Sequence, residues 1–189
     1  MTTAQKGPAT WTIDATHTEV AFAVRHLMIS TVRGRFGAVT GSVTIDEQNP
    51  KASTIEATID VTSIDTRQEA RDNHLRSADF FDVENHPTMH FVSKRVEGNI
   101  ASEFLLVGDL TIRGSTQEVT LAVTNEGRGI DPWGNDRVGV SATGKIKRSD
   151  FGLVWNQALE AGGVAVGDEV KLSLDLELVR QAAAANVAA

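Results

Sequence analysis

Alternation of apolar and polar residues with a period of two is the feature that most constrains the fold of this chain. In EVKLSLDLELV, residues 169–179, every second position from Val170 to Leu178 is apolar, and the positions between them are polar. The segments STIEATIDV (53–61) and TEVAFAVRH (18–26) follow the same pattern. Because successive side chains of a strand point to opposite faces, these segments predict strands with one buried and one solvent-exposed face.

The rest of the chain adds strands and the turns that join them. Further strands are predicted at the following segments: 33–46, 88–96, 103–112, 118–123 and 137–147. The links between them are short and rich in turn-forming residues, as in EQNPKA, RGST and GIDPWGNDR. Glycines inside the strands (Gly37, Gly41, Gly108 and Gly144) predict bulges or bends that curl a sheet. The pattern indicates an antiparallel all-β sandwich or barrel.

One segment departs from the strand pattern. DTRQEARDNHLRS is polar and rich in helix formers, and Thr66 followed by Glu69 resembles a capping box. We expect a short helix at about 67–76, packed on the sheet. A single domain is expected over 10–180, with flexible tails at 1–9 and 181–189.

Composition excludes several classes of function. The chain has no cysteine, so disulfides and thiolate sites are excluded, and its net charge of −7 argues against a nucleic-acid partner. The first residues lack the apolar core of a signal peptide, and no run of about 18 apolar residues predicts a membrane span. A cytoplasmic location is the expectation.

Three of the five histidines, His74, His86 and His90, fall within residues 73–91. His86 and His90 have a spacing that brings two ligands together on a helix, but Pro87 favours extended backbone here, which holds them apart. No GxSxG elbow or phosphate-binding loop is present. We therefore predict no catalytic and no metal site. The alternative is an enzyme acting on a lipid or small molecule through a histidine-assembled site, with or without a metal, that also recruits His17.

The inward-facing positions of the predicted strands form either a filled core or the wall of a ligand cavity, and the pattern alone permits both. These positions are Phe22, Val24, Ile59, Leu110, Ile112, Val140, Leu172 and Leu174. His26 shares the phase of Phe22 and Val24, so it is either a headgroup ligand or a core histidine. Arg25, together with Arg33 or Arg35, is a further candidate for binding a headgroup phosphate at the mouth, with solvation as the alternative.

Several motifs resemble the YceI-like family of polyisoprenoid-binding, lipocalin-like barrels. They are WTIDATHTEVAFAVRHL, VRGRFGAVTGSVTID, the run SIDT–NHL–DFFD–TMHF, VGDLTIRGSTQEVTLAV, IKRSDFGL and VGDEVKLSLDLELV. The resemblance covers residues 11–179. It implies a closed antiparallel eight-stranded barrel whose apolar tunnel holds a long lipid without covalent chemistry.

The resemblance also suggests ligands and further contact residues. The expected ligand is a polyisoprenoid, an isoprenoid quinone or a fatty acyl lipid, and no cofactor is required. The protein would carry or sequester it, and a homodimer is possible through exposed strand edges. The additional residues expected to contact lipid are Phe36, Leu75, Phe80, Phe81, Phe91 and Trp155. His86 stands where the family commonly has tyrosine, so a contact made by that ring is altered in this chain.

Overall fold

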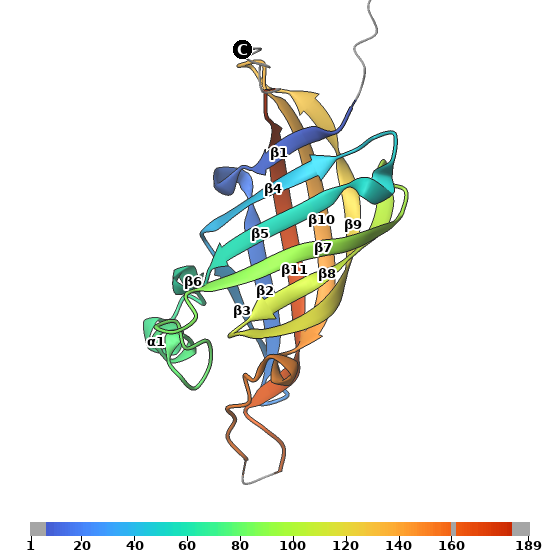
Figure 1. Cartoon of the computed structure of the whole chain (residues 1–189). Helices are drawn as coiled ribbons and strands as arrows, with labels where there is room; N and C mark the ends of the chain where they lie inside the picture. The colour runs from blue at the N-terminus through green and yellow to red at the C-terminus, as the bar shows by residue number, and fades with distance from the viewer. Residues whose placement is uncertain (1–6, 160–161, 183–189) are drawn as a thin grey trace, which may run out of the picture.

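The computed structural model describes residues 7–159 and 162–182, and within them the chain is built almost entirely of strands (Figure 1). The strands are β1 (Ala9–Ile13), β2 (Glu19–His26), β3 (Ser30–Phe36), β4 (Val39–Ile45), β5 (Thr54–Asp60), β6 (Ile64–Asp65), β7 (Thr88–Gly98), β8 (Glu103–Ile112), β9 (Ser115–Ile130), β10 (Asp136–Lys147) and β11 (Val166–Arg180). The helical elements are α1 (Glu69–Arg76) and the 3-10 turns η1 (Ala15–His17), η2 (Pro50–Ala52), η3 (Val61–Ser63) and η4 (Arg148–Phe151).

Eight strands close a ring of antiparallel pairs in the order β1-β4-β5-β7-β8-β9-β10-β11, and β11 pairs back to β1. The remaining strands are continuations of ring members. Strands β1 and β2 lie along the same edge of β11, while β4 and β3 pair with β1 and β2, respectively. The turn η1 therefore marks a bend between β1 and β2, and η3 marks a bend between β5 and β6. The expected closed eight-stranded barrel with a helix packed on it is confirmed.

The lower half of the barrel is split between β6 and β7. Strand β6 pairs with β3, whereas β7 pairs with β5 and β8, and no β6–β7 pairing occurs in the described residues. Helix α1 and the segment 77–87 lie beside this split (Figure 1). The helix therefore sits where the sheet does not close by its own hydrogen bonds.

Helix α1 begins at Glu69 rather than at the expected Arg67. Arg67 has a φ of 62°, which is left-handed backbone that cannot start a right-handed helix. The N-cap is Gln68, whose side chain accepts a hydrogen bond from the Arg71 amide. Thr66 does not cap the helix. It is buried and donates its backbone and hydroxyl hydrogen bonds to Asp72, which ties the helix to the end of β6.

The strand glycines have a different role from the expected one. The register shifts lie elsewhere, at Ser93/Arg95, Gly139/Val140 and Val166/Val170. Gly108 instead leaves room for a neighbouring ring, because a Cβ at this position would overlap Phe91. A Cβ at Gly144 would likewise crowd Leu121. These glycines allow large inward side chains to lie flat against the wall.

The expected tails lie mostly outside the described residues, which exclude 1–6 and 183–189. Two residues of those tails are held by the barrel. Ala9 belongs to β1, and the Gln181 amide donates to the Thr10 carbonyl at 2.8 Å. Ordered backbone pairing therefore extends at least one residue beyond each expected boundary.

Candidate functional site

An apolar cavity of about 600 Å³ lies inside the barrel. Its wall is made by the inward-facing residues of the strands, which alternate with outward-facing polar ones as the sequence predicts. Six lining residues are polar or charged: Glu47, Ser53, Asn99, Asn125, Arg128 and Arg148. The volume falls within the usual range of small-molecule pockets. The alternative between filled core and cavity is thus resolved in favour of a packed wall around an open interior.

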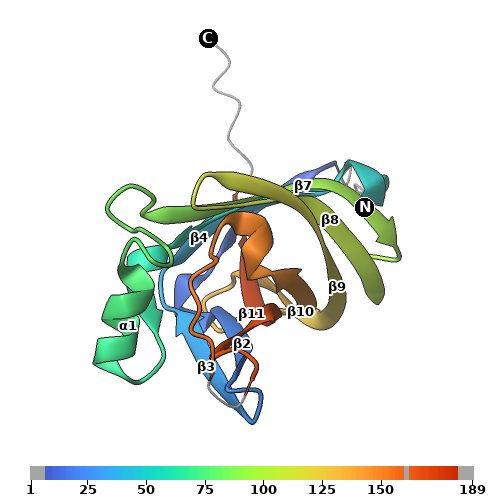
Figure 2. The same ribbon diagram turned by 90° about the horizontal axis from the view of Figure 1, so that it is seen from below.

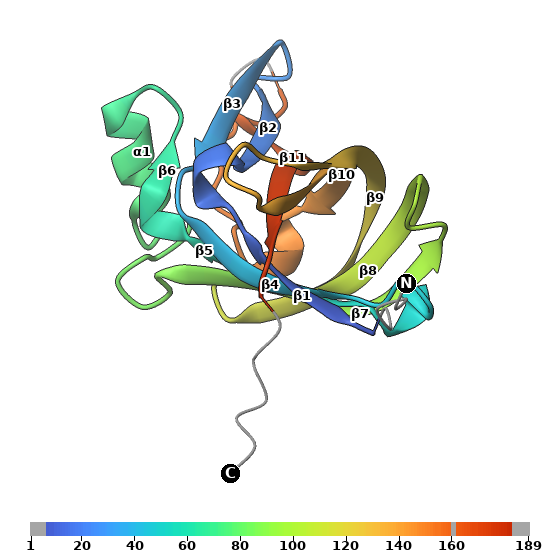
Figure 3. The same ribbon diagram turned by 90° about the horizontal axis from the view of Figure 1, so that it is seen from above.

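The cavity opens toward the upper end of the barrel, where several of its lining residues are exposed. Glu47 follows β4, Asn99 lies between β7 and β8, and Arg128 is on β9. The β7–β8 hairpin stands away from the β9–β10 hairpin at this end (Figures 1 and 3). Arg128 donates to Glu47 at 2.8 Å and to both carboxylate oxygens of Asp136. The mouth is therefore polar, with its arginine already neutralised.

The lower end is closed by η4 and the segment that follows it (Figure 2). Phe151 and Leu153 are buried here and line the cavity. Arg148 is also buried, and burial lowers the pKa of its guanidinium against the opposing charge of Asp168. Its nitrogens donate to the carbonyls of Leu153, Trp155, Val166 and Gly167. One guanidinium thus joins the segment after η4 to the start of β11.

The split side is closed by aromatic side chains from the segment after α1. Phe81 packs edge-on against Phe36, with ring centroids 5.9 Å apart, and Phe36 contacts Phe22 at 5.6 Å. Phe80 lines the cavity behind an outer pair of rings, His74 and Trp155. His74 also bonds Asp79 at 2.9 Å. The residues DFFD predicted beside the tunnel therefore cover the gap between β6 and β7.

Most residues expected to contact lipid line the cavity: Phe22, Val24, Phe36, Ile59, Leu75, Phe80, Phe81, Phe91, Leu110, Ile112 and Val140. Contact with a lipid remains a prediction for them. The cavity also uses residues that sequence reasoning did not select, including Trp11, Phe151 and Arg128. Trp11 is the central residue of β1, where apolar and polar residues alternate, so the sequence carried a signal for it. Arg128 did not, because only tertiary pairing places it at the mouth.

The headgroup candidates and one aromatic residue lie away from the cavity. His26 ends β2 and pairs with Ser30, beyond the last lining residue of that strand. Arg25 points outward and donates to the Met28 carbonyl at 2.6 Å. Arg35 pairs with Asp65 at 3.2 Å on the outside. Trp155 packs over Phe80 and is not part of the wall.

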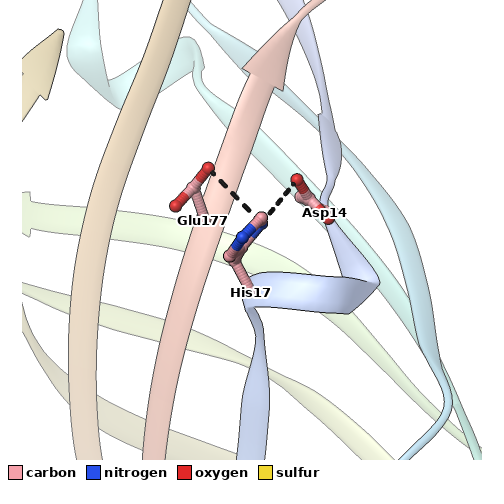
Figure 4. Close-up of side chains that lie close together, drawn as sticks. All are labelled: Asp14, His17 and Glu177. Atoms are coloured by element: carbon pink, nitrogen blue, oxygen red, sulfur yellow. Dashed lines mark hydrogen bonds and ion pairs between the residues drawn. The ribbon is translucent and has the colours of Figure 1, made fainter. Parts of the chain in front are cut away.

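None of the five histidines is among the residues that line the cavity. Across residues 7–159 and 162–182, Asp14, His17 and Glu177 are the only group of three potential metal ligands found close together (Figure 4). His17 Nδ1 lies 3.0 Å from Asp14 and 3.9 Å from Glu177. Arg137 already donates to both carboxylates, so a cation occupies the position that a metal would need. His17 is exposed and the two carboxylates are half-buried, and the ion pairs with Arg137 give the group a structural character.

The electrostatics of Asp14 agree with that interpretation. Hydrogen bonds from Thr16, Arg137 and His17 hold the pKa of its carboxyl well below the ordinary value. His90 bonds Thr58 and Thr88 and is not part of the group of potential metal ligands found among the described residues. None of the described helices is long and apolar enough to cross a membrane.

Comparison with known proteins gives consistent matches over nearly the whole described chain. A family model for the YceI-like domain matches residues 11–178. A UPF0312 protein of Staphylococcus aureus (strain MSSA476) is 41% identical over 168 residues, covering 88% of this chain and 95% of that one. The structure of BcnA from Burkholderia cenocepacia has a TM-score of 0.76 at 24% identity, covering 87% of this chain and 98% of that one. A polyisoprenoid-binding domain from Saccharophagus degradans, implicated in plant cell wall breakdown, has a TM-score of 0.66 at 16% identity, covering 92% and 99%.

Proposed function

This chain belongs to the YceI-like domain family, and from that premise we propose that it binds a long-chain isoprenoid or similar amphiphilic lipid inside its barrel. The observation that carries the proposal is an apolar cavity of about 600 Å³ that is closed below and open above. The related fold of a polyisoprenoid-binding domain supports the same class of ligand. The protein would carry or sequester the lipid without chemical change.

Burial of hydrocarbon would supply the affinity. Each CH₂ group transferred from water into the cavity contributes about 0.8 kcal/mol, so about ten carbons contribute about 8 kcal/mol before the costs of ordering the chain. Because this term depends on apolar area, isoprenoid quinones, prenyl phosphates and fatty acyl chains are all suitable. No cofactor is needed for this role.

The polar headgroup would lie at the upper mouth, among Glu47, Asn99 and Arg128. A charged or hydrated group is costly to bury, and the lower end offers only a guanidinium whose donors are largely used by carbonyls. This placement replaces Arg25, His26 and Arg35 as the residues near the headgroup. The cytoplasmic location and the homodimer remain predictions, which cell fractionation and light scattering would test.

Native mass spectrometry of the full chain, purified without detergent, tests the proposal directly. We expect an added mass that organic solvent removes and that matches an isoprenoid or acyl lipid. The stripped protein should then take up an isoprenoid quinone or a prenyl phosphate from solution. A bare protein that takes up neither of these nor a fatty acid would refute lipid binding.

A further inference from the structure

Four large apolar side chains are exposed together at the lower end of the barrel. Met28 and Ile29, in the β2–β3 turn, have exposed fractions of 52% and 80%. Val154 and Val164, in the segment between η4 and β11, have exposed fractions of 69% and 38%. We call these four residues the lower apolar patch. Scattered single exposures need no explanation, but apolar residues that gather on one surface mark an interaction site.

Backbone hydrogen bonds hold the two parts of the patch side by side. The Leu27 amide donates to the Ala165 carbonyl at 2.8 Å, and His26 pairs with Val166. Arg148 donates to the carbonyls that flank Val154 and to the Val166 carbonyl. The patch is therefore a fixed surface assembled from two distant segments of the chain.

The β2–β3 half of the patch lies in a positively charged stretch, whereas Asp168 and Glu169 at the start of β11 border the other half. No acidic residue occurs between Glu19 and Asp46, whereas the chain has a net charge of −7. Arg25 and Arg33 are exposed within this stretch, and no described carboxylate lies within ion-pair distance of either one. Arg25 donates to Thr31 and to the Met28 carbonyl, so both guanidinium groups keep their full charge without a carboxylate partner. Such groups beside apolar side chains match an anionic partner that also has an apolar interior.

The upper end offers an instructive contrast. Ile130 and Trp133, in the β9–β10 hairpin, are 68% and 81% exposed. The nearby arginines are paired, Arg128 with Asp136 and Arg137 with Asp131. Apolar exposure thus occurs at both ends of the barrel, but among the described residues only the lower patch adjoins arginines that have no carboxylate partner.

The backbone of the β2–β3 turn also points to a role other than folding. Leu27 and Met28 have φ values of 49° and 60°, in the left-handed region that favours glycine and asparagine. Bulky apolar residues are strained there and gain little burial at Met28 in return. Strain retained at an exposed tip is typical of residues kept for binding.

We propose that the lower end of the barrel docks on an anionic lipid bilayer. The four side chains of the lower apolar patch would enter the boundary between headgroups and acyl chains, while Arg25 and Arg33 would bind lipid phosphates. Val24 and Val166 line the cavity and lead directly into the two segments of the patch. Docking would therefore bring the cavity wall close to the hydrocarbon from which a lipid ligand is drawn. The docking itself does not depend on a bound ligand.

Vesicle flotation of the full chain tests this surface. We expect binding to phosphatidylcholine vesicles that contain phosphatidylglycerol, and much weaker binding to phosphatidylcholine alone. Met28→Ser/Ile29→Ser should weaken the binding by roughly tenfold or more, because two apolar side chains no longer insert. Arg25→Gln/Arg33→Gln should weaken binding to the anionic vesicles by roughly thirtyfold and remove most of its salt dependence.

The matched control is Ile130→Ser/Trp133→Ser, which removes exposed apolar side chains from the opposite end and should leave flotation unchanged. Met28→Gly separates folding from docking, since it should raise the Tm by relieving strain and still lower vesicle binding. Native mass spectrometry on each variant reports lipid occupancy independently of docking. Absence of binding to anionic vesicles would overturn the proposal, as would equal loss in the control. Self-association that depends on Met28 and Ile29 without vesicle binding would instead assign the patch to contacts between protein chains.

Discussion

A bulky side chain placed on the cavity wall should exclude the lipid without harming the fold, and Ala142→Phe is the sharpest such change. Ala142 is a small wall residue on β10, 5% exposed, and it pairs with Val123 and Leu174 on the two neighbouring strands. A phenylalanine side chain there would project its ring into the open interior. The ring then fills space that ligand carbons would occupy.

The expected magnitude comes from the carbons displaced. Replacing alanine by phenylalanine adds about six carbons, and at about 0.8 kcal/mol for each displaced CH₂ the binding becomes weaker by about 5 kcal/mol. That corresponds to an increase in Kd on the order of a thousandfold. The stability of the lipid-free protein should change little, because burial of the ring contributes about 2 kcal/mol and local crowding costs about the same.

Two measurements on the same preparations check this expectation. Fluorescence titration of stripped protein with a labelled polyprenyl lipid gives the Kd, and urea unfolding gives the stability. Ala122→Phe is the matched control, because Ala122 is an exposed residue on the outer face of the adjacent strand β9. It should bind lipid as the native chain does. Unchanged affinity in a folded Ala142→Phe variant would show that lipid binds elsewhere, and equal loss in both variants would show a general effect on the fold.

Two further predictions concern the lower closure and the upper rim. Arg148→Met should lower the free energy of unfolding in urea by about 3 kcal/mol, because buried carbonyls at Leu153, Trp155 and Gly167 lose their donor. Arg148→Lys should recover little of this stability, since one ammonium group cannot reproduce the planar arrangement of guanidinium donors. Full stability of Arg148→Met would contradict the assigned closure. Asp14→Asn should make the free energy of unfolding depend less on pH under acidic conditions. The pKa of Asp14 is lowered on folding, so its stabilisation is complete above the ordinary value of 3.8 and is lost as pH falls below it. The stability difference between native and variant protein should therefore shrink as pH falls from about 5 to about 2 in thermal melts, and a constant difference would refute this role.

The strand framework could be predicted from local pattern because burial in a sheet is encoded every second residue. The alternation at 169–179 and 53–61 correctly assigns the inward faces of β11 and β5. Alternation was a poor guide to the cavity wall where a strand runs past the end of the barrel. His26 has the phase of Phe22, yet it lies beyond the cavity because β2 continues into the turn that bears Met28.

The helix start and the headgroup residues illustrate a different limit. The capping pattern at Thr66 and Glu69 is local, but Thr66 is buried in contact with Asp72, and this tertiary contact overrides the local preference. Arg25 and Arg35 were expected to meet a headgroup phosphate at the mouth, but no local pattern indicates at which end of the barrel a mouth forms. The mouth formed at the opposite end, from residues on β9 and the β4–β5 and β7–β8 connections.

The sequence by itself determined that this chain forms antiparallel strands with one apolar face, a short helix and no thiol chemistry. Those properties follow from side-chain type and a period of two, both of which are local. Tertiary structure alone decided that the apolar faces enclose an open cavity and that η4 with Arg148 closes one end. It also joined the β2–β3 turn to the segment before β11 through the hydrogen bond from the Leu27 amide to the Ala165 carbonyl. The reason is that the interior volume of a barrel depends on strand number, stagger and bends, which are properties of the assembled sheet and of no single segment.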